Sequence, residues 1–335
     1  MAAQFSRRHV LKLSGGVAAS TLAAPGIIRA QSGILLRYGH SQPIEHSTHQ
    51  AALAFVEAVD ELSAGEIRVD LFPNNQLGVD RELQGMIESG SLDLTHTNSA
   101  TLAAFVPQMN VMNYPFIWQD ADHYLRVVDG EFGEQINAIT APASGHRFIA
   151  WWFDGFRNVY TRSRPVESLE DMAGLKVRSP QSPIFVETFR ALGANPTPLA
   201  FPEIYSALEA GVIDGFEGSN GIIWSSHLYE VSDYRVVTGH IMVGFGLVIA
   251  EQTYAGLPDE ARAVIAEAAG RAQGVQRDIQ LGSEDELARQ FVTEGGLTEN
   301  QPDLAAFREA VEPVIAAFDA EAGTQELLAT IRAGA

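Results

Sequence analysis

The sequence predicts an α/β fold in which two βαβ lobes enclose a cleft and a long helix near the C-terminus lies across both. Three observations support this prediction. Residues 33–153 and 156–240 each alternate strand patterns with amphipathic helix patterns, and no Pro/Ser-rich linker separates them. The residues after 250 are mainly helical in pattern. A chain of 335 residues is also long enough to build two lobes.

The first region is expected to form three strands with a helix in each connection. Between residues 46 and 65, apolar side chains recur at helical spacing until a glycine ends the run. A second, shorter helix opens at Asp80 and closes at a glycine. Strands are expected over 35–38, 66–72 and 92–98. This order predicts a parallel layer with crossover helices.

The second region repeats the pattern. The expected strands are 147–153, 175–179 and 212–217, and the expected helices are 183–193 and 202–210. The apolar segment 236–250 is shorter than the roughly 20 residues of a membrane span and is interrupted by His240, so it predicts one or two buried strands. A long helix begins at Pro258 and continues towards Phe291.

These elements predict the division of the chain into lobes. One lobe is expected from residues 31–155 plus about 241–283, and the other from 156–240 plus about 284–335. Ligands of open α/β layers bind outside the carboxyl ends of the strands. The cleft between the lobes is therefore the expected binding site.

Residues 1–30 have the features of an export signal. Paired Arg7 and Arg8 precede Lys12 and a mildly apolar stretch of small residues that ends at Ala30. The pattern resembles a twin-arginine signal, with cleavage near Ala30 and a mature protein in the periplasm. An ordinary secretory signal with two arginines and an uncleaved leader remain alternatives. The chain contains no cysteine, so its stability must come from a large core rather than from disulfides.

The charge of the chain limits its partners. At pH 7 the net charge is −20, and residues 1–30 carry four basic and no acidic side chains, so export would leave the mature chain more acidic still. Such a charge repels nucleic acids and anionic membrane surfaces, which we exclude as partners. A small acid can still bind where basic side chains gather locally.

Two arginines are candidates for such a local basic site. Arg178 ends the strand 175–179 and precedes a Ser-Pro turn, and Arg157 follows the strand 147–153. Both stand at the carboxyl end of a strand, where the cleft is expected. A guanidinium group holds a carboxylate through two parallel hydrogen bonds, so the pair predicts a small carboxylic acid as ligand. A surface ion pair is the alternative for either arginine.

Further polar and aromatic residues are candidates for the rest of the site. His40 and Glu45 lie in a loop that also holds His46 and His49. A zinc site is an alternative there, although the order Glu-His-x-x-His differs from that of zinc proteases. Asn98 could cap a helix or reach a ligand, and Trp152 and Phe201 could line the cleft or lie in the core. No cysteine nucleophile, G-x-S-x-G motif or phosphate loop is present, so we expect neither an enzyme nor a cofactor or metal.

Most of residues 34–257 resemble one family. The longest matching run is GLKVRSPQSPIFVETFRALGANPTPLAFPEIYSALEAGVIDGFEG. Further matches are FPNNQLG, DRELQGMIESGSLDLTHTNSA, FVPQMNVMNYPFIW, DGFRNVYTRSRPV and HLYEVSDYRVVTGH. These motifs, in this order, resemble the DctP-like solute-binding proteins of tripartite ATP-independent periplasmic (TRAP) transporters.

The resemblance implies a bilobed periplasmic binding protein fold with a long bracing helix. It also implies that Arg178 pairs with the ligand carboxylate, that Arg157 supports it, and that a small and a large membrane permease subunit are partners. The family usually carries Gln-Glu-Asn where this chain has Phe216, Glu217 and Gly218, so one polar ligand contact is missing. That change predicts extra room and an aromatic wall. Sialate binders place a glutamate where this chain has Asn98.

The expected function is the capture of a small organic acid, either a sugar acid or a hydroxy or keto acid, for delivery to a permease. The nine expected ligand-binding residues are Arg178, Arg157, Asn98, Glu217, Phe201, His40, Glu45, Trp152 and Phe216. A monomer is expected. Two alternatives remain at this stage: an exported metal-dependent α/β enzyme that acts on acids, and a ligand-presenting partner of a sensor kinase.

Overall fold

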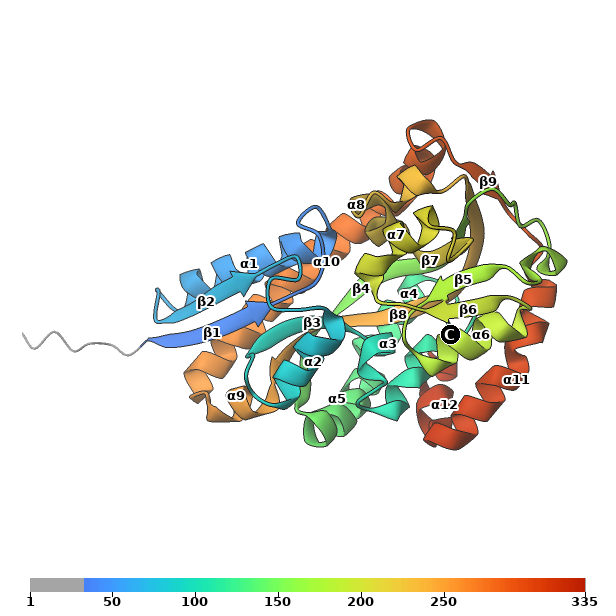
Figure 1. Ribbon diagram of the computed structural model, residues 1–335. Coiled ribbons are helices and arrows are strands. Elements are labelled where there is room, and N and C mark those ends of the chain that lie inside the picture. Colours follow the sequence, from blue (N-terminus) through green and yellow to red (C-terminus); the bar gives the residue numbers. More distant parts are fainter. Residues whose placement is uncertain (1–32, 335) are drawn as a thin grey trace, which may run out of the picture. The chain divides into compact units, whose positions relative to one another are not determined.

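A nine-stranded mixed sheet runs through residues 33–334, the part of the chain that this computed structural model describes (Figure 1). The strand order is β2-β1-β3-β8-β4-β7-β5-β6, and β9 pairs with β8. The strands are β1 (Ile34–Gly39), β2 (Ile67–Phe72), β3 (Leu94–Asn98), β4 (His146–Thr161), β5 (Lys176–Ser179), β6 (Asn195–Pro198), β7 (Gly215–Ser219), β8 (Tyr234–Ala250) and β9 (Thr298–Asn300). The expected export signal lies outside the described residues.

Two groups of parallel strands occupy the two ends of this sheet, as predicted. At one end β1 pairs in parallel with β2 and β3, and at the other end β5 pairs in parallel with β6 and β7. Between these groups, β4 and β8 form an antiparallel pair. β8 also pairs antiparallel with β3, and β4 pairs antiparallel with β7. The predicted strands 147–153 and 236–250 are therefore parts of two long strands, of 16 and 17 residues, that join both ends.

Helices flank the sheet and follow its strands. They are α1 (Ser47–Leu62), α2 (Asp80–Glu88), α3 (Ser99–Leu102), α4 (Ala121–Val128), α5 (Glu131–Ser144), α6 (Pro183–Ala191), α7 (Ile204–Glu209), α8 (Asn220–Ser225), α9 (Glu251–Gly256), α10 (Asp259–Thr293), α11 (Ala305–Ala322) and α12 (Gln325–Ala333). Short 3-10 helices are η1 (Pro107–Asn113), η2 (Leu169–Met172), η3 (Phe201–Glu203) and η4 (Leu228–Val231). None of these helices is long and apolar enough to cross a membrane.

The long helix α10 has 35 residues and confirms the prediction of a helix from Pro258 towards Phe291. It packs against α1 beside the first parallel group, against β4 in the middle, and against α8 beside the second group (Figure 1). Asp259 and Glu260 in its first turn complement the positive end of the helix dipole. This helix therefore braces both ends of the sheet, together with β4 and β8.

The hydrophobic core is divided in the same way. One cluster packs α1 against β1, β2 and the beginning of α10, and includes Phe55 and Trp152. Another fills the space around α4 and α5 and includes Phe132. Two smaller clusters lie around β5 with α6 and around β7 with α7. Each parallel group has its own core, so a cavity between the two groups does not interrupt either core.

Four histidines close to the first parallel group are buried. Nε2 of His40 lies 3.0 Å from Nδ1 of His49, and the His40 ring stacks on that of His96 at 4.6 Å between centroids. Nδ1 of His96 is 3.0 Å from the hydroxyl of Tyr38. Burial lowers the pKa of His40 to about 3 and that of His96 well below its usual value. Burial likewise lowers the pKa of His46 to about 4.

These histidines predict a loss of stability in mild acid. Burial lowers the pKa of His146 to about 4, and together with His40, His46 and His96 it makes four imidazoles that stay neutral in the fold but protonate in the unfolded chain below about pH 6.5. Each therefore removes up to about 1.4 kcal/mol per pH unit as the pH falls from 6.5 towards 4. Three carboxyl groups with raised pKa act in the opposite direction; they are those of Asp80, Asp154 and Glu284. The histidines outnumber them, so the net effect is destabilising.

Urea unfolding at pH 7, 6 and 5 measures this effect. We expect the free energy of unfolding to fall as the pH falls, and His146→Gln to reduce the slope. His227→Asn is the control, because the His227 side chain is 61% exposed. An unfolding free energy that does not change between pH 7 and 5 would contradict the assignment of neutral buried histidines.

Candidate ligand-binding cavity

A cavity of about 130 Å³ lies where strands of both parallel groups end. Asn98 stands at the end of β3 and Arg178 on β5, and the segments that follow β1, β2 and β6 add to its lining, as do parts of β4 and β8. In both groups these are the carboxyl ends of the strands, the position in which open α/β layers bind ligands. Four of the nine expected residues line the cavity: Arg178, Arg157, Asn98 and Phe201.

Arg178 is fixed in the wall of the cavity by the chain that follows β6. Its Nε and Nη2 donate hydrogen bonds to the backbone oxygen of Leu199 at 3.0 and 2.8 Å. Its guanidinium group lies 5.8 Å from the centre of the Phe201 ring, within the range of a cation–π contact. Although burial lowers the pKa of Arg178 to about 10, the side chain stays charged at neutral pH.

Arg157 is held by Glu217 on the neighbouring strand. Nε and Nη2 of Arg157 each donate to one carboxylate oxygen of Glu217, the second at 2.7 Å, and Nη2 also donates to the Glu217 backbone oxygen at 3.2 Å. Nη1 of Arg178 lies 3.9 Å from the same carboxylate, and Nε2 of His240 lies 3.7 Å from it. Burial alone would raise the pKa of Glu217, but Arg157 and His240 together hold it at about 2.

The structure therefore corrects the expectation for Glu217. Its side chain is fully buried and does not line the cavity. β7 places it beneath Arg157 because β4 and β7 are hydrogen-bonded neighbours in the sheet. Instead of facing a ligand, Glu217 satisfies and orients the arginine that does line the cavity.

One nitrogen of each arginine keeps its hydrogen-bonding capacity. Within residues 33–334, no hydrogen bond involves Nη1 of Arg157 or Nη1 of Arg178. The two guanidinium groups share the carboxylate of Glu217, and the acidic side chains that line the cavity with them are Asp80 and Asp154. Two buried guanidinium groups with unused N–H groups suit a carboxylate ligand.

The wall built by the first parallel group carries hydroxyl, amide and carboxyl side chains instead of guanidinium groups. The Ser41 hydroxyl and the Asn98 amide nitrogen, the latter at 3.3 Å, both donate to the carboxyl group of Asp80. Oδ1 of Asn98 accepts a hydrogen bond from the backbone N–H of Thr101 at 2.8 Å and so caps α3. Burial raises the pKa of Asp80, and Ser41, Arg178 and Asn98 act against that rise. This wall offers hydrogen bonds to hydroxyl groups.

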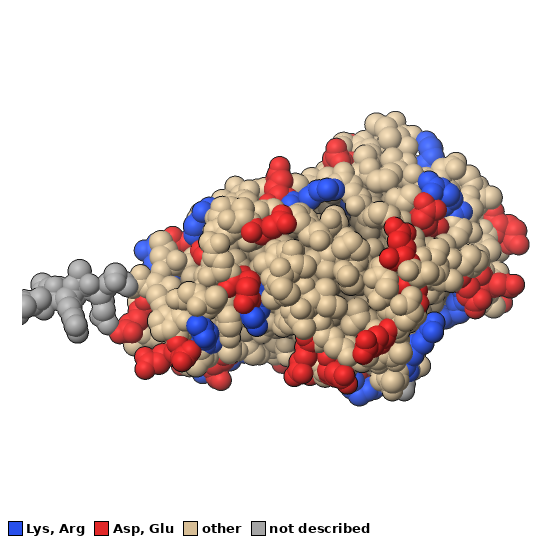
Figure 2. All heavy atoms as spheres, turned by 90° about the horizontal axis from the view of Figure 1, so that it is seen from below, with Lys and Arg blue, Asp and Glu red and all other residues tan. Residues whose placement is uncertain are grey.

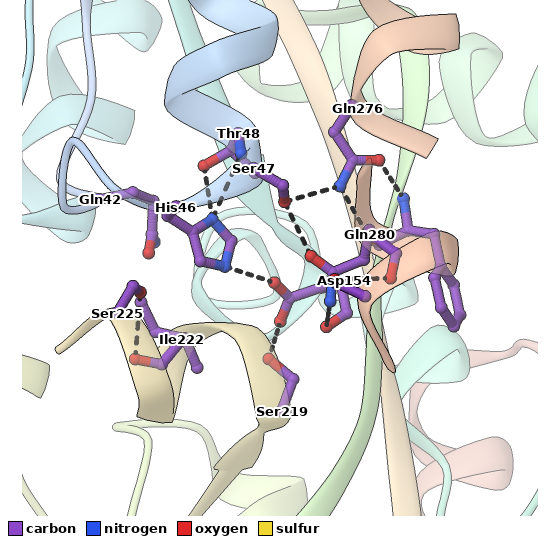
Figure 3. Close-up of polar contacts among 12 residues, drawn as sticks. Gln42, His46, Ser47, Thr48, Asp154, Ser219, Ile222, Ser225, Gln276 and Gln280 are labelled. Atoms are coloured by element: carbon purple, nitrogen blue, oxygen red, sulfur yellow. Dashed lines mark hydrogen bonds and ion pairs between the residues drawn. The ribbon is translucent and has the colours of Figure 1, made fainter. Parts of the chain in front are cut away.

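Asp154 completes the polar lining where β4 passes between the two parallel groups. Its Oδ2 accepts a hydrogen bond from the Ser219 hydroxyl at 3.0 Å, and its Oδ1 lies 3.6 Å from Nε2 of His46 (Figure 3). Gln280 on α10 donates to the Asp154 backbone oxygen at 3.4 Å. The carboxyl group therefore contacts segments from both ends of the sheet.

The expected aromatic walls lie in the core instead. Trp152 is fully buried and packs on Phe245 and His96. Phe216 is fully buried and stacks on Tyr160, with 5.5 Å between ring centres. Neither lines the cavity. A strand presents alternate faces, and both faces of these central strands are covered, so the sequence pattern could not show that both aromatic side chains are core residues.

The loop residues His40 and Glu45 also lie outside the cavity lining. His40 is buried against His49 and His96, and Glu45 is exposed. The loop instead contributes Ser41 and Gln42 to the cavity. No group of three or more side chains able to hold a metal ion occurs within residues 33–334, and His40 and His49 contact each other.

Gly218 does not open the space that its sequence context predicts. A Cβ atom added at Gly218 would lie 2.6 Å from Cδ1 of Ile223, so the buried Ile223 side chain fills the direction in which a longer residue would point. The expectation of extra room beside Glu217 is therefore wrong. The space beside Gly218 is filled by apolar packing.

Sequence reasoning missed Ser41, Asp80 and Asp154. Ser41 lies in the loop after β1, Asp80 begins α2 and Asp154 lies within β4. Many surface residues of an acidic chain have the same types and positions, so the sequence did not single these three out. The position of Asp154 three residues before Arg157 was the one available signal.

The charge of the cavity contrasts with that of the surface. On the face shown in Figure 2, acidic and basic side chains are interspersed, and no basic patch stands apart. Arg157 and Arg178 are 8% and 4% exposed. Their charge is therefore available mainly inside the cavity, where water screens it little.

Comparison with known proteins identifies the family. The model of the bacterial extracellular solute-binding proteins, family 7 (DctP), matches residues 38–321. A solute-binding protein of Roseobacter denitrificans is 34% identical over 311 residues, which cover 92% of this chain and 95% of that protein. The chain belongs to this family, which includes the solute-binding proteins of TRAP transporters.

Two solved structures show the same fold with ligands. A TRAP periplasmic solute-binding protein of Roseobacter denitrificans with bound L-galactonate has a TM-score of 0.83 and 33% identity, covering 89% of this chain and 98% of that one. One of Chromohalobacter salexigens with bound D-glucuronate has a TM-score of 0.86 and 29% identity, covering 90% and 100%. The predicted family and the bilobed binding-protein fold are thereby confirmed.

The buried Arg157–Glu217 pair gives a first prediction for the site. Glu217→Gln removes the only carboxylate that pairs with Arg157 in the described residues and leaves a buried cation without a counter-charge. We expect the free energy of unfolding to fall by about 3 kcal/mol or more. Urea unfolding measures the change.

The matched control is Glu187→Gln. Its partner Arg190 is 61% exposed and Glu187 itself is 43% exposed. An exposed pair of this kind contributes less than about 1 kcal/mol. Equal and small losses in the two variants would show that Glu217 does not stabilise the folded protein through Arg157.

Proposed function

We propose that this protein is a periplasmic solute-binding protein that captures a small hydroxylated carboxylic acid, such as a sugar acid, and delivers it to the membrane subunits of a TRAP transporter. The observation that supports the proposal best is the pair of buried arginines with unused Nη1 groups in one cavity. Export through the segment 1–30 would place the protein in the periplasm.

The two arginines have different roles in this proposal. Arg178, fixed by Leu199, holds the ligand carboxylate, and Arg157 on β4, held by Glu217, adds a second donor. Because two guanidinium groups share the single carboxylate of Glu217, a ligand carboxylate buried beside them has a positive partner and is not left as a bare charge. The hydroxyl groups of the ligand face Ser41, Asp80 and Asn98, which form the polar wall.

The two lobes close over the ligand in this proposal. Ser41, Asp80 and Asn98 belong to the first parallel group, whereas Arg178 and Phe201 belong to the second. A ligand that contacts both groups binds the closed arrangement better and so shifts the equilibrium towards it. The closed form would be the one that the permease recognises.

The relatives support the class of ligand. L-galactonate and D-glucuronate, bound in the two solved structures, are both sugar acids with one carboxylate. A thermal-shift screen of residues 31–335 with sugar acids, hydroxy acids, amino acids and neutral sugars tests the proposal. A ligand at about 100 times its Kd adds roughly 2.7 kcal/mol, which raises the Tm of a chain of this size by about 4 °C. A shift only with neutral or cationic compounds or a divalent metal would overturn it.

Substitution of Arg178 gives the second prediction for binding. Arg178→Ala leaves the ligand carboxylate buried without its main partner, so we expect the affinity for the acid found in the screen to fall by a hundredfold or more, or about 3–5 kcal/mol. Isothermal titration calorimetry measures the change. Arg178→Lys keeps the charge but loses the planar fork, and we expect an intermediate affinity.

Arg190→Ala serves as the control for this experiment, since Arg190 lies on the exposed face of α6 and does not line the cavity. Its affinity should equal that of the unchanged protein. Wild-type affinity in Arg178→Ala, with an unchanged Tm, would remove Arg178 from the site.

A further inference from the structure

Asp154 is a buried carboxyl group in the wall of a cavity that is proposed to bind an acid. Its side chain is 7% exposed, and it lines the cavity together with Arg157 and Arg178. A negative charge at this point would repel an acidic ligand. The surroundings of Asp154 decide whether the group carries that charge.

Nearby basic side chains do not neutralise Asp154. The two nitrogens of Arg157 that form hydrogen bonds, Nε and Nη2, both donate to Glu217. His46 caps α1: its Nδ1 accepts a hydrogen bond from the backbone N–H of Thr48 at 3.3 Å. The proton of the imidazole is therefore on Nε2, which faces Asp154 in the neutral ring (Figure 3). A cation at this position would also oppose the positive end of the α1 dipole.

The groups that face Asp154 from each packed element are few. They are His46 at the start of α1, Tyr124 on α4, Arg157 on β4, Glu217 and Ser219 on β7, and Glu284 on α10. Burial raises the pKa of Asp154 to about 7; Arg157 and Ser219 act against the rise, while Glu284 and Glu217 add to it. Near neutral pH the group is thus poised between its two forms.

We infer that the carboxyl group of Asp154 sets the charge of the cavity, so that the protein binds a monocarboxylic acid together with one proton and rejects dicarboxylic acids. The inference rests on the proposed function and narrows its ligand class. It concerns a specificity-determining residue that does not itself pair with the ligand carboxylate.

The charge balance of the cavity carries the inference. Arg157 and Arg178 face two carboxyl groups besides that of Asp154, those of Glu217 and Asp80. Protonation of Asp154 removes one negative charge from this set and so favours one ligand carboxylate, whereas an ionised Asp154 would add its charge beside that of the ligand in a buried site. A second ligand carboxylate would find only Arg81, which is exposed at the rim and screened by water.

Isothermal titration calorimetry on the mature chain, residues 31–335, tests the inference. The probe is D-glucuronate if D-glucuronate raises the Tm in the thermal-shift screen, and otherwise the sugar acid that raises it. Titrations at pH 6, 7 and 8 in two buffers of different ionisation enthalpy give the number of protons taken up. We expect close to one proton at pH 8 and almost none at pH 6, with affinity falling by up to about tenfold per pH unit above 7.

Variants identify the titrating group. Asp154→Asn should bind at pH 8 as tightly as the unchanged protein binds at pH 6, without proton uptake. Ser219→Ala removes the hydroxyl that favours the ionised form, so the pH dependence should move to higher pH. Glu57→Gln, an exposed position on α1, should behave as the unchanged protein does.

Asp80 is the second carboxyl group in the cavity lining. Proton uptake that persists in Asp154→Asn, or disappears in Asp80→Asn instead, would overturn the assignment to Asp154. Acid binding without proton uptake at any pH would overturn the inference and leave the proposed function intact, whereas no binding of any acid would remove the proposed function itself.

Selectivity provides an independent measurement. D-gluconate and D-glucarate are both open-chain acids, and D-glucarate has a second carboxylate where D-gluconate has a CH2OH group. We expect D-glucarate to bind the unchanged protein a hundredfold or more weakly than D-gluconate because its second carboxylate has no buried cation. Equal affinity for the two acids would overturn the selectivity part of the inference.

Discussion

The buried ion pair between Arg157 and Glu217 is the interaction on which the site depends. Taking a guanidinium group out of water is costly unless a partner with matching geometry accepts its hydrogen bonds. Glu217 is that partner, and it can act only because β4 and β7 lie side by side in the sheet. The pair fixes Arg157 before any ligand arrives. The same carboxylate lies close to Arg178 and His240, so one acidic side chain organises the positive wall of the cavity.

The sheet topology explains why this wall faces a cavity rather than solvent. β4 and β8 run through the middle of the sheet and join two groups of parallel strands, each with its own core. The carboxyl ends of both groups meet at the cavity, one providing hydroxyl and carboxyl groups and the other guanidinium groups. Asp154 lies where β4 passes from one group to the other, and its contacts with His46 and Ser219 join them. Asp154 on β4 therefore both lines the cavity and contacts segments from the two ends of the sheet.

The sequence predicted the architecture better than the site. Hydrophobic periodicity and glycine stops located the strands and most helices, because these patterns are local. The helices α4 and α5 were not predicted, nor was the pairing of β4 with β8, which brings together residues about ninety positions apart along the chain. For the site, Arg157, Arg178, Asn98 and Phe201 line the cavity as expected. Glu217, Trp152 and Phe216 were expected to face a ligand but are buried, since residue type alone does not distinguish a side chain that faces a cavity from one that faces the core.

The position of β8 has a consequence for how the chain acquires its structure. This strand lies near the middle of the sheet, but it comes late in the sequence, at residues 234–250. Until it is synthesised, β3 has no neighbour on one side and β4 lacks its longest pairing, so both expose open edges of the kind that promote association between chains. Neither half of the molecule can complete its own sheet first. A nascent or truncated chain that stops before β8 should therefore need protection by chaperones, and the protein's vulnerability to aggregation is concentrated in the period before the last third of the chain is made.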